Sequence, residues 1–214
     1  MAPPSDRKNR RFITGEDVQS LPHGAILDLP EGAILTDIAR EWIQKKQIRV
    51  VPASKSPGEA SQKGRIAVGS DHAGYEMKEA VKALLSEMGE TFVDYGTHST
   101  DSVDYPDFAH AVALAVAVGS AQLGIVIDGA GIGSAIAANK VPGVRAAPCP
   151  DEATARNSRE HNDANVLTLG ARSISKEMMA RVVRAFLASE MTEERHRRRV
   201  GKMIRIERKY NRGI

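Results

Sequence analysis

From Arg65 onward, short apolar stretches alternate with segments of helical periodicity, and this alternation limits the possible folds more than any other feature of the chain. Short apolar runs bounded by glycine or polar residues are typical of buried strands. When helices connect successive strands, the strands run parallel, the crossovers are right-handed and helices cover both faces of the sheet. The sequence therefore predicts an α/β domain of three layers around a five-stranded parallel sheet.

The predicted elements follow one another in a regular order. Strands are expected at residues 65–70, 91–96, 123–129, 144–149 and 165–170. Helices are expected at 75–88, 107–118, 134–139 and 151 to about 160, with two or more helices after the last strand. This order is typical of a Rossmann-like domain, which we place at residues 65–214.

The first 64 residues differ in composition from the rest. Residues 1–20 are interpreted as an unstructured tail, because they begin with a polar, basic and proline-bearing stretch. Residues 21–51 are interpreted as a small module, in which Thr36 is an N-cap candidate for a helix and residues 48–51 form a short strand. Residues 52–64 have the composition of a flexible linker.

Composition narrows the function classes. The 214 residues are 42% hydrophobic and 27% charged, and they show neither a secretory signal nor an apolar run of membrane-spanning length, so we expect a cytoplasmic protein without a membrane partner. A single cysteine, Cys149, excludes a disulfide framework and a cysteine-cluster metal site. Residues 192–214 hold nine Lys or Arg against three Glu, which suits a phosphorylated small molecule, a membrane surface or nucleic acid. Nucleic acid ranks last, since aromatic content is only 4%.

Candidate site residues follow the predicted strands, because ligands of such sheets bind outside the carboxyl ends of the strands. Asp71 and His72 come after the first strand, where free backbone N–H groups and the helix dipole favour an anion. The alternative is that Asp71 only caps a helix and His72 lies on the surface.

The glycine-rich turn "DGAGIG" follows the third strand. Gly129, Gly131 and Gly133 do not form a GxGxxG pattern, and no P-loop lysine follows, so no nucleotide is predicted. Closely spaced glycines let backbone amides point at one ligand oxygen, as the stabilisation of an enolate requires. A tight strand-to-helix connection is the alternative.

Two further groups of polar residues lie later in the chain. His161 and Asn162 stand just before the last strand, and a histidine can exchange protons near neutral pH. Arg195 and Arg199 are four apart on a predicted helix and could clamp a phosphate. A charge run is also typical of a merely solvated helix face.

Together these segments resemble the ribose-5-phosphate isomerase type B and galactose-6-phosphate isomerase family. The resemblance rests on "GSDHAGYEMK", "DYGTHSTDSVDYPDFA", "GAGIGSAIAANKVPGVRA", "SREHNDANVLTLGAR" and "RHRRRV", in the family's order. It implies a Rossmann-like domain that interconverts aldose and ketose phosphates without metal or cofactor. It also implies a homodimer, or a tetramer, with active sites completed across the dimer interface.

The resemblance assigns a role to each group of candidates. His72, Arg195 and Arg199 would hold the phosphate. His161 would open the sugar ring, and Asp71 and Asn162 would hydrogen-bond its oxygens. The amides that would stabilise the enediolate belong to Gly129, Ala130, Gly131, Ile132 and Gly133. Arg172 and Tyr105 are further candidates near the site.

Two positions depart from the pattern of the family's typical member. Asp128 stands where the typical member has the cysteine that moves the proton, and Ala130 stands where it has threonine or serine. Another branch has a glutamate base at the position of Ser134. We therefore predict that Asp128 is the catalytic base and that burial raises its pKa. The alternative is that catalysis is lost, which leaves a non-catalytic sugar-phosphate-binding or scaffold protein.

The segment "LPEGAILTDIAREWIQKKQIRVV" resembles a short module attached to enzymes of bacterial microcompartments. It implies a location in or beside such a compartment and a shell or cargo partner; the alternative is a small extension that docks on the dimer. For the main domain, ribose 5-phosphate is the first expected substrate, with allose 6-phosphate and galactose 6-phosphate as alternatives.

Overall fold

The computed structural model describes residues 12–13, 15–19, 21, 26–29, 34–52 and 65–211. The chain divides into two compact units, Met1–Ser61 and Gln62–Ile214. Each unit has an apolar core of its own. The division falls inside the predicted linker, whose residues 53–64 lie outside the described ones.

The first unit contains two pairs of parallel strands and two helices in its described part. These are β1 (Phe12–Ile13), α1 (Gly15–Gln19), β2 (Ile26–Leu29), β3 (Ile34–Leu35), α2 (Asp37–Lys45) and β4 (Arg49–Pro52). β1 pairs with β3, and β2 pairs with β4. The Thr36 side chain accepts a hydrogen bond from the Ala39 amide at 3.3 Å, which confirms the predicted N-cap of α2.

The predicted unstructured tail, residues 1–20, is too long. Ile13 and Val18 are buried against Ala39 and Ile48, so β1 and α1 belong to the core of the first unit. These two apolar residues come shortly after the basic stretch, whose composition led to the prediction of an unstructured tail. Residues 1–11 lie outside the described part of the chain.

The second unit is built on one five-stranded parallel sheet, as predicted, in the order β6-β5-β7-β9-β8. The strands are β5 (Ile66–Ser70), β6 (Phe92–Asp94), β7 (Leu123–Asp128), β8 (Ala146–Pro148) and β9 (Val166–Gly170). The helices are α3 (Tyr75–Glu87), α4 (Tyr105–Ala117), α5 (Ile132–Ala138), α6 (Glu152–Asn162), α7 (Lys176–Ala188) and α8 (Glu194–Tyr210). Two helix boundaries differ from the prediction in ways that affect the site. α5 begins inside the glycine-rich turn, and α6 extends far enough to include both His161 and Asn162.

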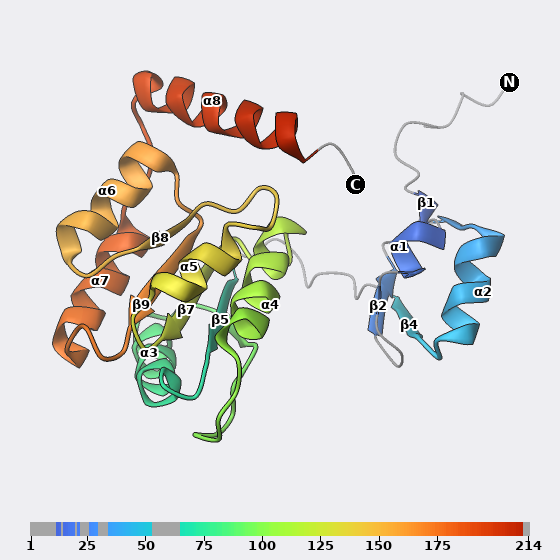
Figure 1. Cartoon of the computed structure of the whole chain (residues 1–214), viewed down its shortest axis with the longest axis horizontal. Helices are drawn as coiled ribbons and strands as arrows, with labels where there is room; N and C mark the ends of the chain where they lie inside the picture. Colours follow the sequence, from blue (N-terminus) through green and yellow to red (C-terminus); the bar gives the residue numbers. More distant parts are fainter. Residues whose placement is uncertain are drawn as a thin grey trace, which may run out of the picture. The chain divides into compact units, whose positions relative to one another are not determined.

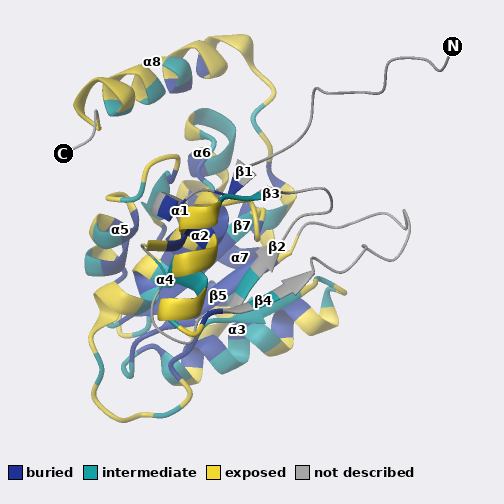
Figure 2. Ribbon diagram, turned by 90° about the vertical axis from the view of Figure 1, so that its right-hand side faces the viewer, coloured by how far each residue is buried: buried dark blue, intermediate teal, exposed yellow. Residues whose placement is uncertain are grey.

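The sheet is buried on both faces because successive side chains of a strand point in opposite directions. Ile125 and Ile127 of β7 face a core made with α3, α6 and α7. Val126 between them faces the core made with α4 and α5. Figure 1 shows these helices on the two sides of the sheet, and Figure 2 shows β5 and β7 as buried and most of α8 as exposed. The predicted three-layer α/β architecture is thus confirmed.

The two central strands β5 and β7 lie where the strand order reverses. After β5 the chain crosses to β6 at one edge, and it then returns to the other side of β5 as β7. The Asp71 amide, just beyond β5, donates to the carbonyl of Ile127 at 3.1 Å. This topology places Asp71 and Asp128 side by side at the position where open parallel sheets bind ligands. Among the described residues, no helix has the length and apolar character needed to cross a membrane.

Candidate active site

Asp128 is the last residue of β7, and its side chain turns back onto the loop that follows it. One carboxylate oxygen, Oδ1, accepts hydrogen bonds from the amides of Ala130, at 2.8 Å, and Gly131. The other oxygen, Oδ2, accepts from the amide of Ser134 at 2.9 Å. The residue is 4% exposed. Asp128 therefore closes the glycine-rich turn and caps α5 from the strand side.

The charge of Asp128 is stabilised by these contacts. Burial favours the neutral carboxyl, but the Ser134 hydroxyl and the amides of Gly131, Ser134 and Ala130 favour the carboxylate and hold the pKa of Asp128 below its usual value. The Ser134 hydroxyl is buried beside the carboxylate without a hydrogen bond of ordinary geometry. The predicted rise in the pKa of Asp128 is wrong, because a carboxylate that accepts several N–H groups is stabilised more than burial destabilises it.

Two glycines of the turn are required by its shape. Gly131 has a φ of 78°, a left-handed conformation that side chains rarely adopt. At Gly133 a Cβ atom would lie 2.7 Å from the ring of Tyr105, so the tyrosine ring packs directly on the turn. Tyr105 thus lies against the glycine-rich turn.

The loop after β9 holds the turn from the other side. The amides of Ala171 and Arg172 donate to the carbonyls of Asp128 and Gly129 at 2.8 and 3.0 Å. The buried hydroxyl of Thr168 donates to the Gly131 carbonyl at 2.7 Å. Arg172 is exposed, and its stem passes 3.8 Å from the Cβ position of Gly129. Thr168 was not among the predicted site residues, although a polar residue inside an apolar strand was a usable signal.

Asp71 and His72 lie beside this turn. Asp71 is buried and accepts a hydrogen bond from the Gly74 amide at 2.9 Å, which caps the turn before α3. The Nδ1 atom of His72 lies 3.1 Å from the carbonyl oxygen and 3.2 Å from the amide nitrogen of Val103, so its tautomer decides which of the two it binds. A cavity of about 390 Å³ opens next to His72 and is also lined by Glu76, Thr100 and Lys176.

A second cluster lies at the carboxyl end of α6. The rings of His161 and of His196 from α8 are stacked, with centroids 4.0 Å apart and planes at 11°. His161 Nδ1 lies 2.9 Å from the side-chain nitrogen of Asn157. Asn162, Arg195 and Arg199 are exposed around the pair, and Arg195 forms an ion pair with Glu193 at 3.2 Å.

The two clusters occupy opposite edges of the sheet. Because α6 runs back from the end of β8 to the start of β9, His161 lies near the amino ends of the strands, whereas Asp128 lies at a carboxyl end. A strand as long as β7 spans about 16 Å. We call the two groups the carboxyl-edge cluster (Asp71, His72, Tyr105, residues 128–134 and Arg172) and the amino-edge cluster (His161, Asn162, Arg195, His196 and Arg199). One chain does not bring them together.

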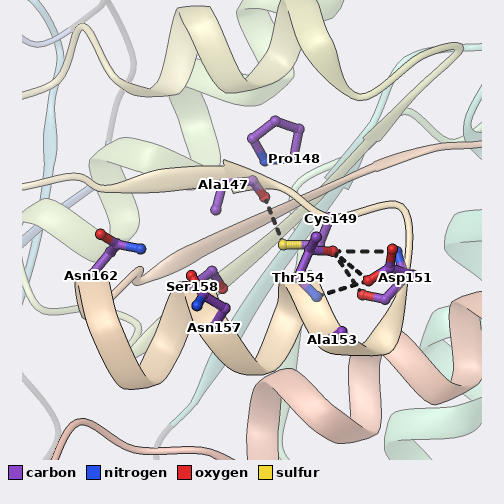
Figure 3. A pocket seen from close by; sticks show the side chains of 9 residues that line it. All are labelled: Ala147, Pro148, Cys149, Asp151, Ala153, Thr154, Asn157, Ser158 and Asn162. Carbon is purple, nitrogen blue, oxygen red and sulfur yellow. Dashed lines mark hydrogen bonds between the residues drawn. The ribbon is translucent and has the colours of Figure 1, made fainter.

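A further cavity, of about 380 Å³, runs between β8 and α6. Figure 3 shows Cys149 near one end of α6 and Asn162 at the other, with the Cys149 thiol directed at the Ala147 carbonyl, 3.6 Å away. Burial raises the pKa of this thiol above its usual value, so it stays protonated. The cavity reaches the amino-edge cluster through Asn157 and Asn162.

Comparisons with known proteins cover the second unit. The sequence profile of a family described as Ribose/Galactose Isomerase matches residues 66–203. Ribose-5-phosphate isomerase B of Escherichia coli is 43% identical over 147 residues, which cover 69% of this chain and 99% of that protein. A putative sugar phosphate isomerase of Bacillus subtilis is 40% identical over 146 residues, 68% of this chain and 98% of that protein.

Solved structures agree with these sequence matches. Ribose-5-phosphate isomerase B of Clostridium thermocellum has a TM-score of 0.67 at 49% identity and covers 68% of this chain and 99% of its own. The type B enzyme of Trypanosoma brucei has a TM-score of 0.64 at 44% identity, with 66% and 97% covered. The resemblance inferred from the five sequence stretches is confirmed, and the chain belongs to the ribose/galactose isomerase family.

Proposed function

We propose that the chain is an aldose–ketose isomerase of sugar phosphates and that it converts ribose 5-phosphate to ribulose 5-phosphate. The observation that carries this proposal is the carboxyl-edge cluster. It gathers Asp71, His72, Arg172 and the glycine-rich turn at the reversal point of the sheet. Curated relatives that match the whole of this domain are named ribose-5-phosphate isomerase B and putative sugar phosphate isomerase.

In the proposed reaction, the protonated His161 gives a proton to the ring oxygen, the bond between C1 and that oxygen breaks, and the C1 hydroxyl loses its proton to solvent, which leaves an aldehyde at C1. Asp71 and Asn162 hold the sugar hydroxyls. A base then takes the proton from C2, and the electron pair passes to the carbonyl oxygen on C1, which forms an enediolate. Return of the proton to C1 and transfer of the hydroxyl proton complete the ketose. The phosphate binds His72 together with Arg195 and Arg199.

The hydrogen bonds of the turn limit which of its amides are free to stabilise the enediolate. Of the five residues 129–133, Ala130 and Gly131 already donate their amides to Asp128. The amides of Ile132 and Gly133 have no acceptor among the described residues. We assign oxyanion stabilisation to these two amides, which open α5 and gain from its dipole.

The proposal includes a homodimer, because the amino-edge cluster must come from a second copy. The support is the separation of about 16 Å between the two edges of the sheet. Apolar side chains are also exposed on two of the helices that carry residues of the clusters. Ile132 and Ile136 on α5 are 59% and 58% exposed, and Ile206 and Tyr210 on α8 are 60% and 74% exposed.

Asp128 remains the proposed base, since it occupies the position of the family's catalytic cysteine. Its Oδ2 atom accepts a single amide hydrogen bond, so a lone pair is left for a substrate proton. The low pKa makes it a weak base, and we expect turnover well below that of a chain with cysteine at this position.

A second candidate function is a sugar-phosphate-binding protein without catalysis. It is favoured by the same observation: both oxygens of Asp128 are engaged by the loop, and the pKa of its carboxyl is lowered. This carboxylate would then serve only to hold the turn.

The test is a coupled isomerase assay on ribose 5-phosphate with the wild type, Asp128→Asn, Asp128→Cys and His161→Ala. The proposal expects turnover in the wild type, more in Asp128→Cys, and loss in the other two. Calorimetric titration with ribose 5-phosphate runs alongside. Binding without turnover in the wild type, with turnover gained in Asp128→Cys, would establish the non-catalytic alternative.

For the first unit we separately propose that it recruits the enzyme to a partner, such as the shell or cargo of a protein compartment in the cytoplasm. The support is its independent core of Ile13, Val18, Ala39 and Ile48, together with a family match that starts only at residue 66.

A further inference from the structure

His196 is a buried histidine that the proposed reaction leaves without a role. It is 3% exposed, and neither ring nitrogen has a hydrogen-bond partner among the described residues. Buried polar groups in native proteins are nearly always hydrogen-bonded, so this side chain needs an explanation. The His196 ring stacks almost parallel on the ring of His161, and the two ring centroids lie 4.0 Å apart.

The stack comes from two helices that meet at the amino edge. α8 starts beside α6 and lies across one end of the domain, as Figure 1 shows. Glu207, near the other end of α8, accepts a hydrogen bond from the Gly143 amide at 3.0 Å. Val200, one turn beyond His196, is 4% exposed and anchors the start of α8. The His196 ring is therefore fixed on the face of His161 that lies toward α8, while His161 keeps partial exposure.

His161 is also held by a neighbour on its own helix. Asn157 lies one turn earlier on α6, and its side-chain NH₂ group lies 2.9 Å from His161 Nδ1. An NH₂ group only donates, so Nδ1 must accept. The neutral His161 ring then carries its proton on Nε2.

The surroundings of His196 keep its ring uncharged. Burial lowers the pKa of His196, and the positive charges of His161, Arg195 and Arg199 lower it further, against a smaller opposing effect of Glu193. A neutral ring can stay stacked on His161 whether His161 is neutral or protonated. Charge repulsion across the 4.0 Å stack is thereby avoided during proton transfer.

We propose that Asn157 and His196 are positioning residues for His161: Asn157 binds Nδ1, which leaves Nε2 to face the substrate, and His196 fixes the plane of the ring. The inference rests on the proposed function, in which the imidazolium form of His161 protonates the ring oxygen through Nε2–H. In that form Nδ1 also carries a proton, which the oxygen of the Asn157 amide accepts once the amide has rotated, and the neutral ring that remains after the transfer keeps this proton. A general acid must hold its N–H within hydrogen-bond reach of the acceptor, and orienting groups on the opposite side supply that geometry. In this role His196 acts through the face of its ring, which stacks on His161, and its two nitrogens need no hydrogen-bond partner.

The experiment uses full-length protein with ¹⁵N-labelled histidine. Imidazole NMR reports the tautomer of His161 and the ring-current shift that His196 imposes on it. The variants are Asn157→Leu, His196→Leu and His196→Phe, and His161→Gln assigns the signals. His110→Leu, an exposed histidine on α4, is the matched control.

The inference predicts a single Nε2–H tautomer in the wild type and a mixture in Asn157→Leu. The ring-current shift should vanish in His196→Leu and persist in His196→Phe. For the two Leu variants, kcat on ribose 5-phosphate should fall about tenfold or more while KM changes little, because positioning acts on the transition state. His196→Phe should retain most of the turnover, which shows that a folded, stacked aromatic suffices.

Unchanged imidazole signals in both Leu variants, or changed signals with unchanged kcat, would overturn the inference. A wild type that isomerises no sugar phosphate would instead overturn the proposed function. The NMR result would still decide whether Asn157 and His196 position the ring, so the two failures are distinguishable.

Discussion

The carboxyl edge and the amino edge of the sheet differ in how their charged groups are satisfied. At the carboxyl edge, the Asp128 carboxylate is buried and engaged by three amides of its own chain. At the amino edge, the ring nitrogens of the buried His196 have no hydrogen-bond partner among the described residues, and Arg195 and Arg199 are exposed. The first edge is organised by hydrogen bonds within the chain, whereas the second presents exposed arginines to solvent. This difference supports the proposal that a second copy of the chain completes the site.

The largest expected effect comes from removing the proton-transfer group of the amino edge. His161→Ala should lower kcat on ribose 5-phosphate by about 10²–10⁴-fold, the usual contribution of a general acid. His110→Ala on the surface of α4 is the control and should leave kcat unchanged. Equal activity of the two variants would show that the amino edge takes no part in the reaction.

The pH dependence of the free energy of unfolding tests whether the Asp128 carboxylate stabilises the turn at the carboxyl edge. Because the folded-state pKa of Asp128 is lowered, its carboxylate stabilises the fold above the unfolded-state pKa of about 3.9, and this stability is lost as pH falls through the folded-state value. Asp128→Asn should therefore lower the free energy of unfolding at pH 7 by about 1–3 kcal/mol, with a smaller difference below pH 4. Denaturant melts at both pH values measure this.

The control for the acid experiment is Glu87→Gln, which removes an exposed carboxylate of α3. It should leave both the stability and its pH dependence nearly unchanged. If Asp128→Asn behaves like Glu87→Gln, the carboxylate does not hold the turn.

The packing of Tyr105 on the turn gives a smaller and more local effect. Gly133→Ala should destabilise the chain by about 1–3 kcal/mol, because the new methyl group overlaps the tyrosine ring. In a Tyr105→Ala background the same substitution should become stabilising by up to about 1 kcal/mol, since alanine favours a helix more than glycine does. Thermal melts of the four proteins measure the coupling, and additive effects would contradict the packing.

The smallest expected effect on catalysis is that of the first unit. Deleting residues 1–61 should change kcat and KM on ribose 5-phosphate by no more than about twofold, as is usual for separate domains. A large loss of activity would favour the view that the unit docks on the dimer and supports it.

The fold and the carboxyl edge could be read from the sequence to a large extent. The strands follow from apolar runs, and residues such as Asp71 and Asp128 stand directly at strand ends, so topology alone brings them together. The lowered pKa of Asp128 could not be foreseen, because it depends on three amide directions set by the backbone of the turn. Burial alone, which the sequence does suggest, has the opposite sign.

The amino edge was harder to foresee. The helical position of His161 and its stack with His196 depend on how α6 and α8 pack, which no local pattern specifies. His196 lies inside a run of arginines, and such a charged run is typical of an exposed helix face, so the burial of His196 was not predicted. The short N-terminal strand and helix were missed for the same reason, since Arg10 and Arg11 directly precede the strand Phe12–Ile13.

The most direct test of the account is subunit complementation between the two edges. Asp128→Asn and His161→Ala chains, each inactive as a homodimer, are mixed under conditions that exchange subunits, and the isomerase activity of the mixture is measured. In a mixed dimer one of the two sites combines an intact carboxyl edge with an intact amino edge, so about a quarter of wild-type activity should return on random mixing. No recovery, despite mixed dimers detected by native mass spectrometry, would contradict a site shared between two chains.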